Sequence, residues 1–584
     1  MKEKKASFGQ SFMTGTLILS SSIFIVKVLG IFFRFFVTNM IGPTGAAYFS
    51  VAYEIYNPLF ALSTAGLPIA ISRLVSENVA KGRFKDVRQV HKVSIPIFLL
   101  TGSVGFVLML LGAFFVPRLV NVPGAVYSVI ALSPTILFAC LMSIYRGYHQ
   151  GLRDVIPTAV SEIIEASCKV VIGSVISYLV IIKGVQEFNT FGTVFGKAYE
   201  SQEMALNAIM PFASAGAIIG ISIGAGVGFL YLLFSHKKRG DGISENDVNL
   251  SPKPYNRSYI IKRLIRTAIP IGIGAIIMNI AGFIDTTLIL NRIQYVMSKN
   301  PDDLLMCYSR VIGPEIINSG DGVHGFLLGC YSFTLPLMML IPAITSTFGV
   351  VSLPAVTRAF TKKNKNELQK SVESVIKMTA IVSVPSGIGI AVLGSSLLSI
   401  IYSHRAGAVS IASNIVPILG VATIFMAAST PICSMLQAVG RVDLPVKIIT
   451  VGLAIKIMVN YLLVGIPTIN IQGAGIGTLV GYVFILITSM YFLFKETRVK
   501  LKLTKTILKP VFASIICGIT AFVSNAFLSK IIPLIISVGL SVVIAIIVYF
   551  FSLTLLKSIE EDDIKSLPKG EELAKIFKKL IIYK

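Results

Sequence analysis

The sequence predicts an all-α polytopic membrane protein. We expect about 14 transmembrane helices: two parallel-repeat six-helix lobes around a central cavity, plus two extra C-terminal helices. Composition is the first reason, because 54% of the 584 residues are hydrophobic and only 14% are charged, with a mean hydropathy of +0.80. Soluble proteins are nearer a quarter charged. The recurrence of long apolar windows and an internal repeat are the second and third reasons.

The apolar windows are long enough to cross a bilayer and are bounded by charged or Gly/Pro-rich stretches. They lie at approximately 13–40, 48–72, 93–117, 123–147, 155–182, 204–234, 264–290, 323–352, 372–396, 411–437, 446–466, 472–494, 509–529 and 532–556. The predicted organisation is therefore an N-lobe (12–235), a cytoplasmic linker (236–263), a C-lobe (264–494), the extra helices (509–556) and a cytoplasmic tail (557–584).

The distribution of lysine and arginine predicts the orientation. With the N-terminus in the cytoplasm, the inner segments hold forty of the 52 Lys and Arg residues, the outer segments hold eight, and four lie inside spans. Such asymmetry is the positive-inside signal, so both termini are predicted to be cytoplasmic and the protein to lie in the cell membrane. The net charge of +24 then reflects topology and contact with anionic membrane lipids, which argues against a nucleic-acid partner.

The C-terminal tail carries its own helical signal. Leu573, Ile576, Phe577, Leu580 and Ile581 follow the spacing of one helix face, with lysines opposite. This predicts an amphipathic helix on the inner leaflet. Docking onto the protein's own cytoplasmic face is the alternative.

Two motifs recur in the same order in both halves. A Leu-Pro segment that ends in arginine closes the second span (67–73) and the eighth (353–358). A segment from Gln to Pro follows the fourth span (150–157) and the tenth (437–445). Six spans separate the copies, so the lobes keep one orientation, as in alternating-access transporters whose substrate site lies at the lobe interface.

The first window contains two cations, Lys27 and Arg34. On a helix, residues seven apart share one face at roughly 10 Å. A lipid-facing charge at mid-membrane costs at least ~2.5–3.5 kcal/mol, so such residues normally face a bundle interior or a water-filled cavity. Snorkelling from a shifted span is the alternative, but it would leave the span of Arg34 too short. We therefore predict a cationic cavity wall.

Lys169 and Lys456 join this set, because each lies eleven or twelve residues after the proline of the second repeated motif. Excess positive charge at mid-depth suits an anionic substrate such as a phosphate or diphosphate. Glu54 and Asp285 are the acidic residues that we place within spans. Asp285, with Asn460, is a candidate for binding a coupling H⁺ or Na⁺, and a structural ion pair with a lysine is the alternative.

No enzyme signature is evident. The sequence lacks a Gly-rich nucleotide loop that ends in Gly-Lys-Ser/Thr. The five histidines are scattered, without a Cys or carboxylate at ligand or triad spacing. Asp302 and Asp303 lie in a predicted outer loop, where a membrane glycosyltransferase could hold a metal, but no further carboxylate or base accompanies them. We predict a transporter rather than an enzyme, with no cofactor and no metal site.

The first helix resembles the MOP flippase superfamily, in particular its MurJ and SpoVB/YtgP type. The segment Lys27-Val28-Leu29-Gly30 followed by Arg34 is similar to that family's first-helix motif, and the segment 145–157 is similar to the one after its fourth helix. Better-known Gram-negative members space the first cation and the arginine by six residues rather than seven. They also carry an aspartate and two arginines where this chain has Ala47, Phe60 and Ala61, so the resemblance points to the Gram-positive branch.

This resemblance implies a flippase for lipid II, the undecaprenyl-diphosphate-linked cell-wall precursor, in vegetative growth or sporulation. Lys27 and Arg34 would hold the diphosphate in the central cavity while the polyprenyl tail stays in lipid. The alternatives are export of another polyprenyl-linked glycan, a multidrug/Na⁺ antiporter of the same superfamily and, from another class, a membrane glycosyltransferase.

Overall fold

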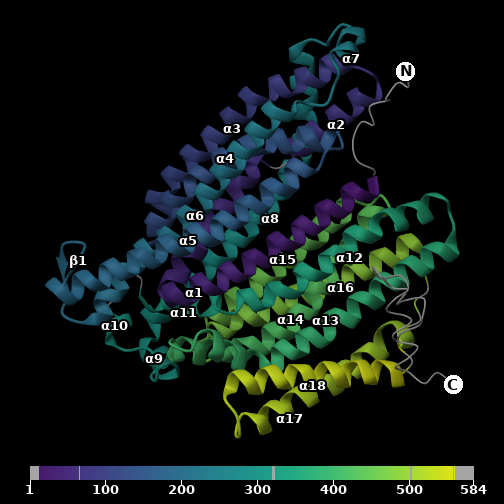
Figure 1. The fold of residues 1–584 in the computed structure, drawn as a ribbon. Helices are drawn as coiled ribbons and strands as arrows, with labels where there is room; N and C mark the ends of the chain where they lie inside the picture. Colours follow the sequence, from purple (N-terminus) through teal and green to yellow (C-terminus); the bar gives the residue numbers. More distant parts are fainter. Residues whose placement is uncertain are drawn as a thin grey trace. The chain divides into compact units, whose positions relative to one another are not determined.

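The computed structural model describes residues 12–64, 66–317, 322–499, 501, 503–556 and 558. The predicted amphipathic tail helix lies outside these residues. By internal contacts the chain divides into two compact units, Met1–Phe333 and Thr334–Lys584 (Figure 1). The predicted lobe boundaries, the parallel repeat and the central cavity stay predictions. In the structure, α8 to α11, which follow the predicted linker, group with the first unit.

The first unit contains eleven helices and one small hairpin among the described residues. The helices are α1 Phe12–Thr64, α2 Leu67–Ala80, α3 Phe84–Leu119, α4 Ala125–Gly151, α5 Ile156–Phe191, α6 Gln202–Arg239, α7 Glu245–Leu250, α8 Arg257–Lys299, α9 Pro301–Cys307, α10 Pro314–Ile317 and α11 Gly322–Ser332. The hairpin pairs β1 (Thr193–Val194) with β2 (Lys197–Ala198) in antiparallel register. Its turn residues Phe195 and Gly196 both have positive φ, as tight hairpin turns require.

The second unit is built from long helices, as described for its own residues. They are α12 Leu335–Thr361, α13 Lys365–Ile401, α14 Ala406–Ala438, α15 Asp443–Val464, α16 Gln472–Thr497, the short π-helix η1 Thr504–Leu508, α17 Lys509–Leu528 and α18 Leu534–Leu555. Helix α14 packs against α12, α13 and α16, and α17 packs against α13 and α18.

Helix α1 contains the first predicted span and most of the second. Gly42 has φ 67° and ψ −171°, values outside the helical region, and Pro43 follows it. A left-handed φ favours glycine, and proline removes a helical hydrogen bond, so the chain kinks here. We predicted that the second span would continue to residue 72, but the helix ends at Thr64 and α2 is a separate element.

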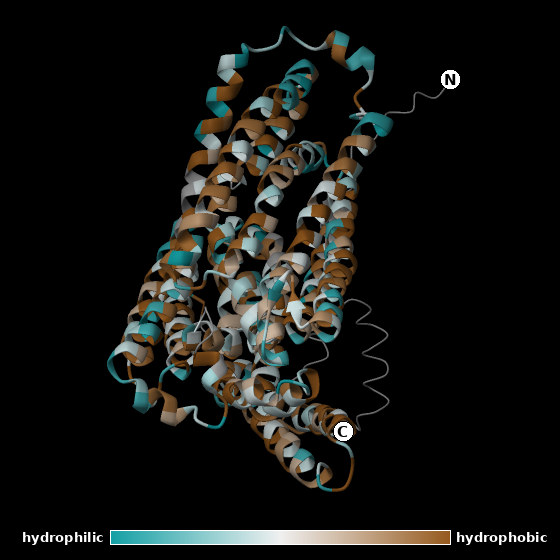
Figure 2. Cartoon of the chain, turned by 90° about the vertical axis from the view of Figure 1, so that its left-hand side faces the viewer, coloured by the Kyte–Doolittle hydropathy of each residue, from teal (hydrophilic) through white to brown (hydrophobic). Residues whose placement is uncertain are grey.

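Twelve helical segments within the described residues are long and apolar enough to cross a membrane. The first of them, Ser21–Ala80, combines the first two predicted spans, and the seventh predicted span corresponds to α8, which is not among the twelve. Large apolar side chains cover the outer surface of the helices, for example Phe115 (71% exposed) and Ile547 (63%). Hydrophobic residues follow the long helices, whereas hydrophilic ones gather in the connections (Figure 2). Such exposure is typical of a lipid-facing surface, and the predicted all-α polytopic membrane fold is confirmed.

Candidate substrate-binding site

The first-helix cation Arg34 lies inside the first unit, where three helical segments meet. Its Nη2 donates to Oγ of Ser50, after the kink in α1, at 2.9 Å. That oxygen lies 3.0 Å from Oγ of Ser332 at the end of α11. The guanidinium also lies over the ring of Phe49, 4.6 Å from its centroid. The residue is partly buried, and its place in a cationic cavity wall stays a prediction.

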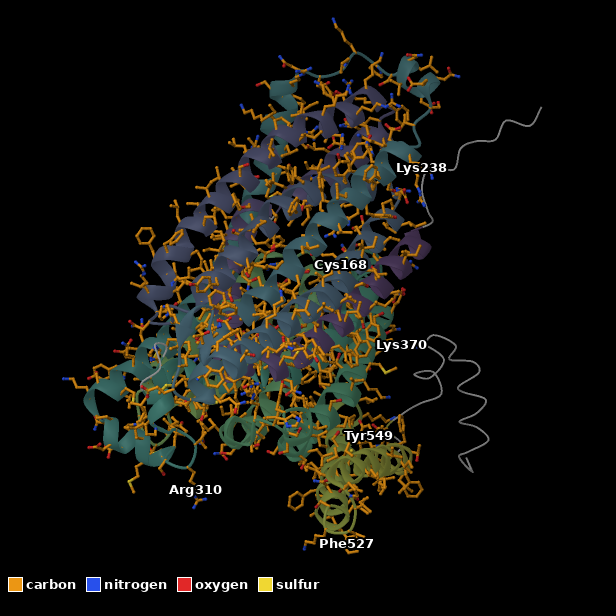
Figure 3. All side chains as sticks on the ribbon, turned by 60° about the vertical axis from the view of Figure 1, so that its left-hand side comes forward. Cys168, Lys238, Arg310, Lys370, Phe527 and Tyr549 are labelled. Carbon is orange, nitrogen blue, oxygen red and sulfur yellow. The ribbon has the colours of Figure 1, made fainter. Side chains whose placement is uncertain are left out.

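The structure brings Lys169 of α5 to the same place. Its Nζ lies 4.9 Å from the centroid of the Phe33 ring, and Phe33 contacts Phe49 with ring centroids 6.2 Å apart. Arg34 and Lys169 therefore rest on the faces of one aromatic pair, where cation–π attraction contributes about 0.5–2 kcal/mol each. Cys168, the neighbour of Lys169, lies among the helices of the first unit (Figure 3).

The other two predicted cations, Lys27 and Lys456, lie on different helices, one in each unit. Lys27 is partly buried in α1, two turns before Arg34. Lys456 belongs to α15 of the second unit, where it packs against Gly481 of α16. A joint site that combines Lys456 with the first-unit cations stays a prediction.

The three residues predicted to bind a coupling ion also divide between the units, with Glu54 and Asp285 in the first and Asn460 in the second. Asp285 is buried in α8 (7% exposed). One turn earlier, a β-carbon at Gly282 would lie 2.9 Å from Oε2 of Glu54, so Glu54 also lies where α1 packs on α8. Asn460 is fully buried in α15, with its side chain against Gly477 of α16. The coupling role of Asp285, Asn460 and Glu54 stays a prediction.

Three further carboxylates inside predicted spans were missed by the sequence reading. Glu162 and Glu165 lie in α5, within the window 155–182, and Glu373 lies in α13, within the window 372–396. It was therefore wrong to count Glu54 and Asp285 as the acidic residues of the spans. Glu165 accepts from Nη2 of Arg146 in α4 at 3.0 Å, and Glu162 accepts from the hydroxyl of Ser22 in α1 at 3.3 Å. The signal was available, because glutamate in an apolar window is costly without a partner.

Three of the five histidines, thought to be scattered, are brought together at one end of the first unit. The rings of His91 in α3 and His236 in α6 have centroids 4.8 Å apart, and those of His149 in α4 and His236 lie 5.4 Å apart. Nδ1 of His149 lies 3.6 Å from Asp154. Within the described residues, no group of three or more histidine, cysteine and acidic side chains could hold a metal ion.

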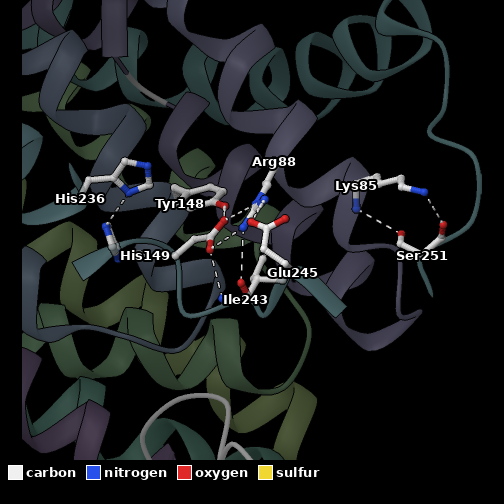
Figure 4. Close-up of polar contacts among 9 residues, drawn as sticks. Lys85, Arg88, Tyr148, His149, His236, Ile243, Glu245 and Ser251 are labelled. Carbon is white, nitrogen blue, oxygen red and sulfur yellow. Dashed lines mark hydrogen bonds and ion pairs between the residues drawn. The ribbon is translucent and has the colours of Figure 1, made fainter. Parts of the chain in front are cut away.

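Beside the histidines, the connection between α6 and α8 is bound to the N-terminal end of α3. We call residues 240–256 the strap. Asp241 accepts from Nε of Arg88 at 2.8 Å, from the amide of Ile243 at 3.1 Å and from the hydroxyl of Tyr148 at 3.3 Å (Figure 4). Further along, the strap residue Ser251 accepts from the amide and from Nζ of Lys85. The predicted polar linker is thus an ordered part of the first unit.

Two carboxylates of this region have perturbed acidity. Burial alone would raise the pKa of Asp241, but the hydrogen bonds from Arg88 and the Ile243 amide, with the charge of Arg88, lower it below its ordinary value. The hydrogen bond with His149 likewise lowers the pKa of Asp154, against the opposing effect of burial. Both groups are therefore ionised at neutral pH.

Comparison with known proteins shows which families and proteins this chain resembles. The model for "Polysaccharide biosynthesis protein" matches residues 12–196 and the model for "MatE" matches residues 324–462. The lipid II flippase MurJ of Bacillus subtilis is 22% identical over 81% of this chain and 80% of that protein. The stage V sporulation protein B of the same organism is 21% identical over 96% of this chain and 98% of that protein. The chain is therefore similar to polysaccharide biosynthesis proteins in its first part and to MatE proteins in its second.

Solved structures show the same fold. A lipid II flippase MurJ in an inward closed conformation matches with a TM-score of 0.58 and 16% identity, over 92% of this chain and 98% of that one. An inward-facing multidrug-resistance MATE family transporter of the MOP superfamily matches with a TM-score of 0.57 and 15% identity, over 84% and 96%. The resemblance predicted from the first helix is confirmed, and so is the prediction of a transporter rather than an enzyme.

Proposed function

We propose that this MOP-superfamily protein is a flippase for a polyprenyl-diphosphate-linked glycan of the lipid II class. It moves the substrate from the inner to the outer leaflet of the cell membrane by alternating access. The observation that carries the proposal is the placement of Arg34 and Lys169 on the Phe33–Phe49 pair. Two cations held by aromatic rings within a membrane-spanning unit suit a diphosphate, which arginine binds through two parallel hydrogen bonds. Similarity to the Bacillus subtilis flippase supports the lipid II class.

A multidrug/Na⁺ antiporter of the same superfamily is the second candidate, because the MATE fold matches almost as well. Its typical substrates are organic cations, which call for an acidic and aromatic site. In the first unit, however, Glu165 is paired with Arg146, whereas the positions next to the aromatic pair are cationic. The charge at this position favours an anionic substrate.

Complementation tests the proposal. Cells depleted of their own lipid II flippase receive the wild-type chain, the Arg34→Ala variant or the Arg118→Ala variant, at matched membrane levels. Arg118 is a matched control because it is an exposed cation at the end of α3. We expect wild type and Arg118→Ala to restore growth, and Arg34→Ala to fail, because loss of a charge-assisted contact costs about 1.5–3 kcal/mol, or roughly 10- to 150-fold in affinity. Failure of well-expressed wild type would overturn the lipid II assignment, and full rescue by Arg34→Ala would overturn the site.

We further propose that Asp285 and Glu54 bind the ion that drives the cycle. Both lie where α8 packs on α1, and one elementary charge moved through the membrane potential gains ~2.3 kcal/mol per 100 mV. Flipping by purified protein in vesicles is compared with and without a Na⁺ or H⁺ gradient. The proteins are wild type, Asp285→Asn and the control Asp302→Asn, whose aspartate is exposed in the first turn of α9. We expect flipping to depend on the gradient in wild type and in Asp302→Asn, and this dependence to be lost in Asp285→Asn. Unchanged flipping in Asp285→Asn after every gradient has collapsed would exclude the idea.

A further inference from the structure

An aromatic ladder continues from the cation pair along the second half of α1. We give this name to Phe49, Tyr53, Tyr56 and Phe60, whose spacing of four, three and four residues places them on one helix face. The rings of Phe49 and Tyr53 are stacked, with centroids 4.8 Å apart and planes 21° apart. Those of Tyr56 and Phe60 are stacked at 5.2 Å and 25°, and the two pairs meet edge-to-face at 5.9 Å.

This stacking fixes where the tyrosine hydroxyls lie. Rings that stack on one another along a helix cover each other's faces and direct their edges away from the helix. Each tyrosine has two rotatable side-chain bonds, and ring contacts on both sides hold both of them. The hydroxyls of Tyr53 and Tyr56 are therefore preorganised at the free edge of the ladder, as a recognition site requires.

The contacts of the described residues do not explain why these two positions carry hydroxyl groups. Among the described residues, neither hydroxyl makes a hydrogen bond, although both side chains are partly buried in a membrane-spanning helix. Phenylalanine would fill the same space at both positions, so packing alone does not explain the two hydroxyls. Tyr56 also lies within the electrostatic reach of Glu165 on α5, the helix that carries Lys169. The ladder and the cation pair therefore border the same interior region.

We propose that Tyr53 and Tyr56 recognise the sugar part of the substrate. Their hydroxyls hydrogen-bond to the hydroxyl or acetamido groups of the first sugars, while Arg34 and Lys169 hold the diphosphate. The inference rests on the proposed function and adds to it a division of the site: cations for the diphosphate common to all such lipids, tyrosines for the glycan. A site that is built to hydrogen-bond a ligand group discriminates strongly against a ligand that lacks it.

Binding to purified full-length protein in nanodiscs tests the division with two probes. One is a polyprenyl diphosphate without sugar, and the other is the same lipid carrying a disaccharide. The variants Tyr53→Phe and Tyr56→Phe keep the rings and their stacking and remove one oxygen each. Tyr178→Phe, at a position 56% exposed on α5, is the matched control. We expect wild type and Tyr178→Phe to bind the sugar-bearing lipid more tightly than the bare one.

Each ladder variant should lose about three- to tenfold in affinity for the sugar-bearing lipid, the effect of one neutral hydrogen bond, with unchanged affinity for the bare diphosphate. Arg34→Ala should weaken both probes. Equal losses on both probes in the tyrosine variants, or no loss on either, would overturn the inference while the proposed function stands. Wild-type protein that binds neither lipid would overturn the proposed function and this inference with it.

Discussion

The carboxylate of Asp241 should control how firmly the strap is held. It accepts from Nε and Nη2 of Arg88 at 2.8 and 3.4 Å, and from the Ile243 amide at 3.1 Å. The side chain of Asp241 is 12% exposed and that of Arg88 is 32% exposed, so the pair is neither fully desolvated nor freely solvated. Hydrogen bonds to charged groups contribute about 1.5–3 kcal/mol, and partial exposure reduces this. We take about 1–2 kcal/mol for loss of the charge in Asp241→Asn.

Amide hydrogen exchange measures this free energy locally. Peptides that cover residues 240–256 of full-length purified protein are followed in wild type, Asp241→Asn and Glu245→Gln. A loss of about 1–2 kcal/mol in local opening corresponds to exchange that is roughly 5- to 30-fold faster. Glu245 also pairs with Arg88, but its side chain is 75% exposed, so the control should change exchange by less than about twofold. Equal effects of the two variants, or unchanged exchange in Asp241→Asn, would refute the reasoning.

The sign of the pH dependence follows from the lowered pKa of Asp241. A group whose pKa is depressed in the folded state stabilises it fully above the unfolded value, about 3.9 for aspartate. That stabilisation is lost as the pH falls through the lower folded pKa. After correction for intrinsic exchange rates, strap protection should therefore stay constant down to about pH 4 and fall below it. The fall should be absent in Asp241→Asn, and a fall of the same size in that variant would contradict the assignment to Asp241.

Two further predictions concern packing and ion pairing in the first unit. A β-carbon at Gly329 would overlap the backbone oxygen of Pro43, whereas one at Gly30 meets nothing within 4 Å. Gly329→Ala should thus lower the apparent Tm, because overpacking costs about 1–3 kcal/mol. The control Gly30→Ala should leave the Tm unchanged or raise it. Equal Tm values for the two variants would contradict the close contact of Gly329 with Pro43. Glu165→Gln leaves Arg146 without its anionic partner at a side-chain exposure of 20%. We expect a loss of about 1–2 kcal/mol in a thermal-unfolding assay in detergent, and no loss would mean that the pair is solvated.

Most helices could be predicted from the sequence, because apolar windows of membrane length have few other stable structures. The ends and bends of the helices were predicted less well, because they depend on local backbone chemistry that hydropathy does not measure. Gly42 bends the chain without an intervening loop, so the first two predicted spans lie in one kinked element that ends at Thr64. The connection after α6 was predicted to be a polar linker. A strap held by Arg88 and Asp241 has the same amino-acid composition as a solvated loop, so the sequence does not distinguish the two.

The site could be predicted only in part for the same reason. Arg34 and Lys169 were found because a charge in an apolar window is conspicuous in any sequence. Their common aromatic platform was not found, since Phe33 and Phe49 are ordinary residues of a membrane helix until the kink brings them together. The histidine cluster likewise depends on α3, α4 and α6 meeting at one end, a tertiary event without a local signal.

The charged residues Glu165 and Lys169 of α5 contact other helices rather than each other. Glu165 and Lys169 are four residues apart, a spacing that favours an ion pair on a single helix. The carboxylate instead lies 3.0 Å from Nη2 of Arg146 on α4, and Lys169 lies over the ring of Phe33. Because a ring face attracts a cation without neutralising it, the charge of Lys169 remains next to Arg34. We therefore expect that Arg146, by holding Glu165, keeps Glu165 from pairing with Lys169 in the proposed diphosphate site.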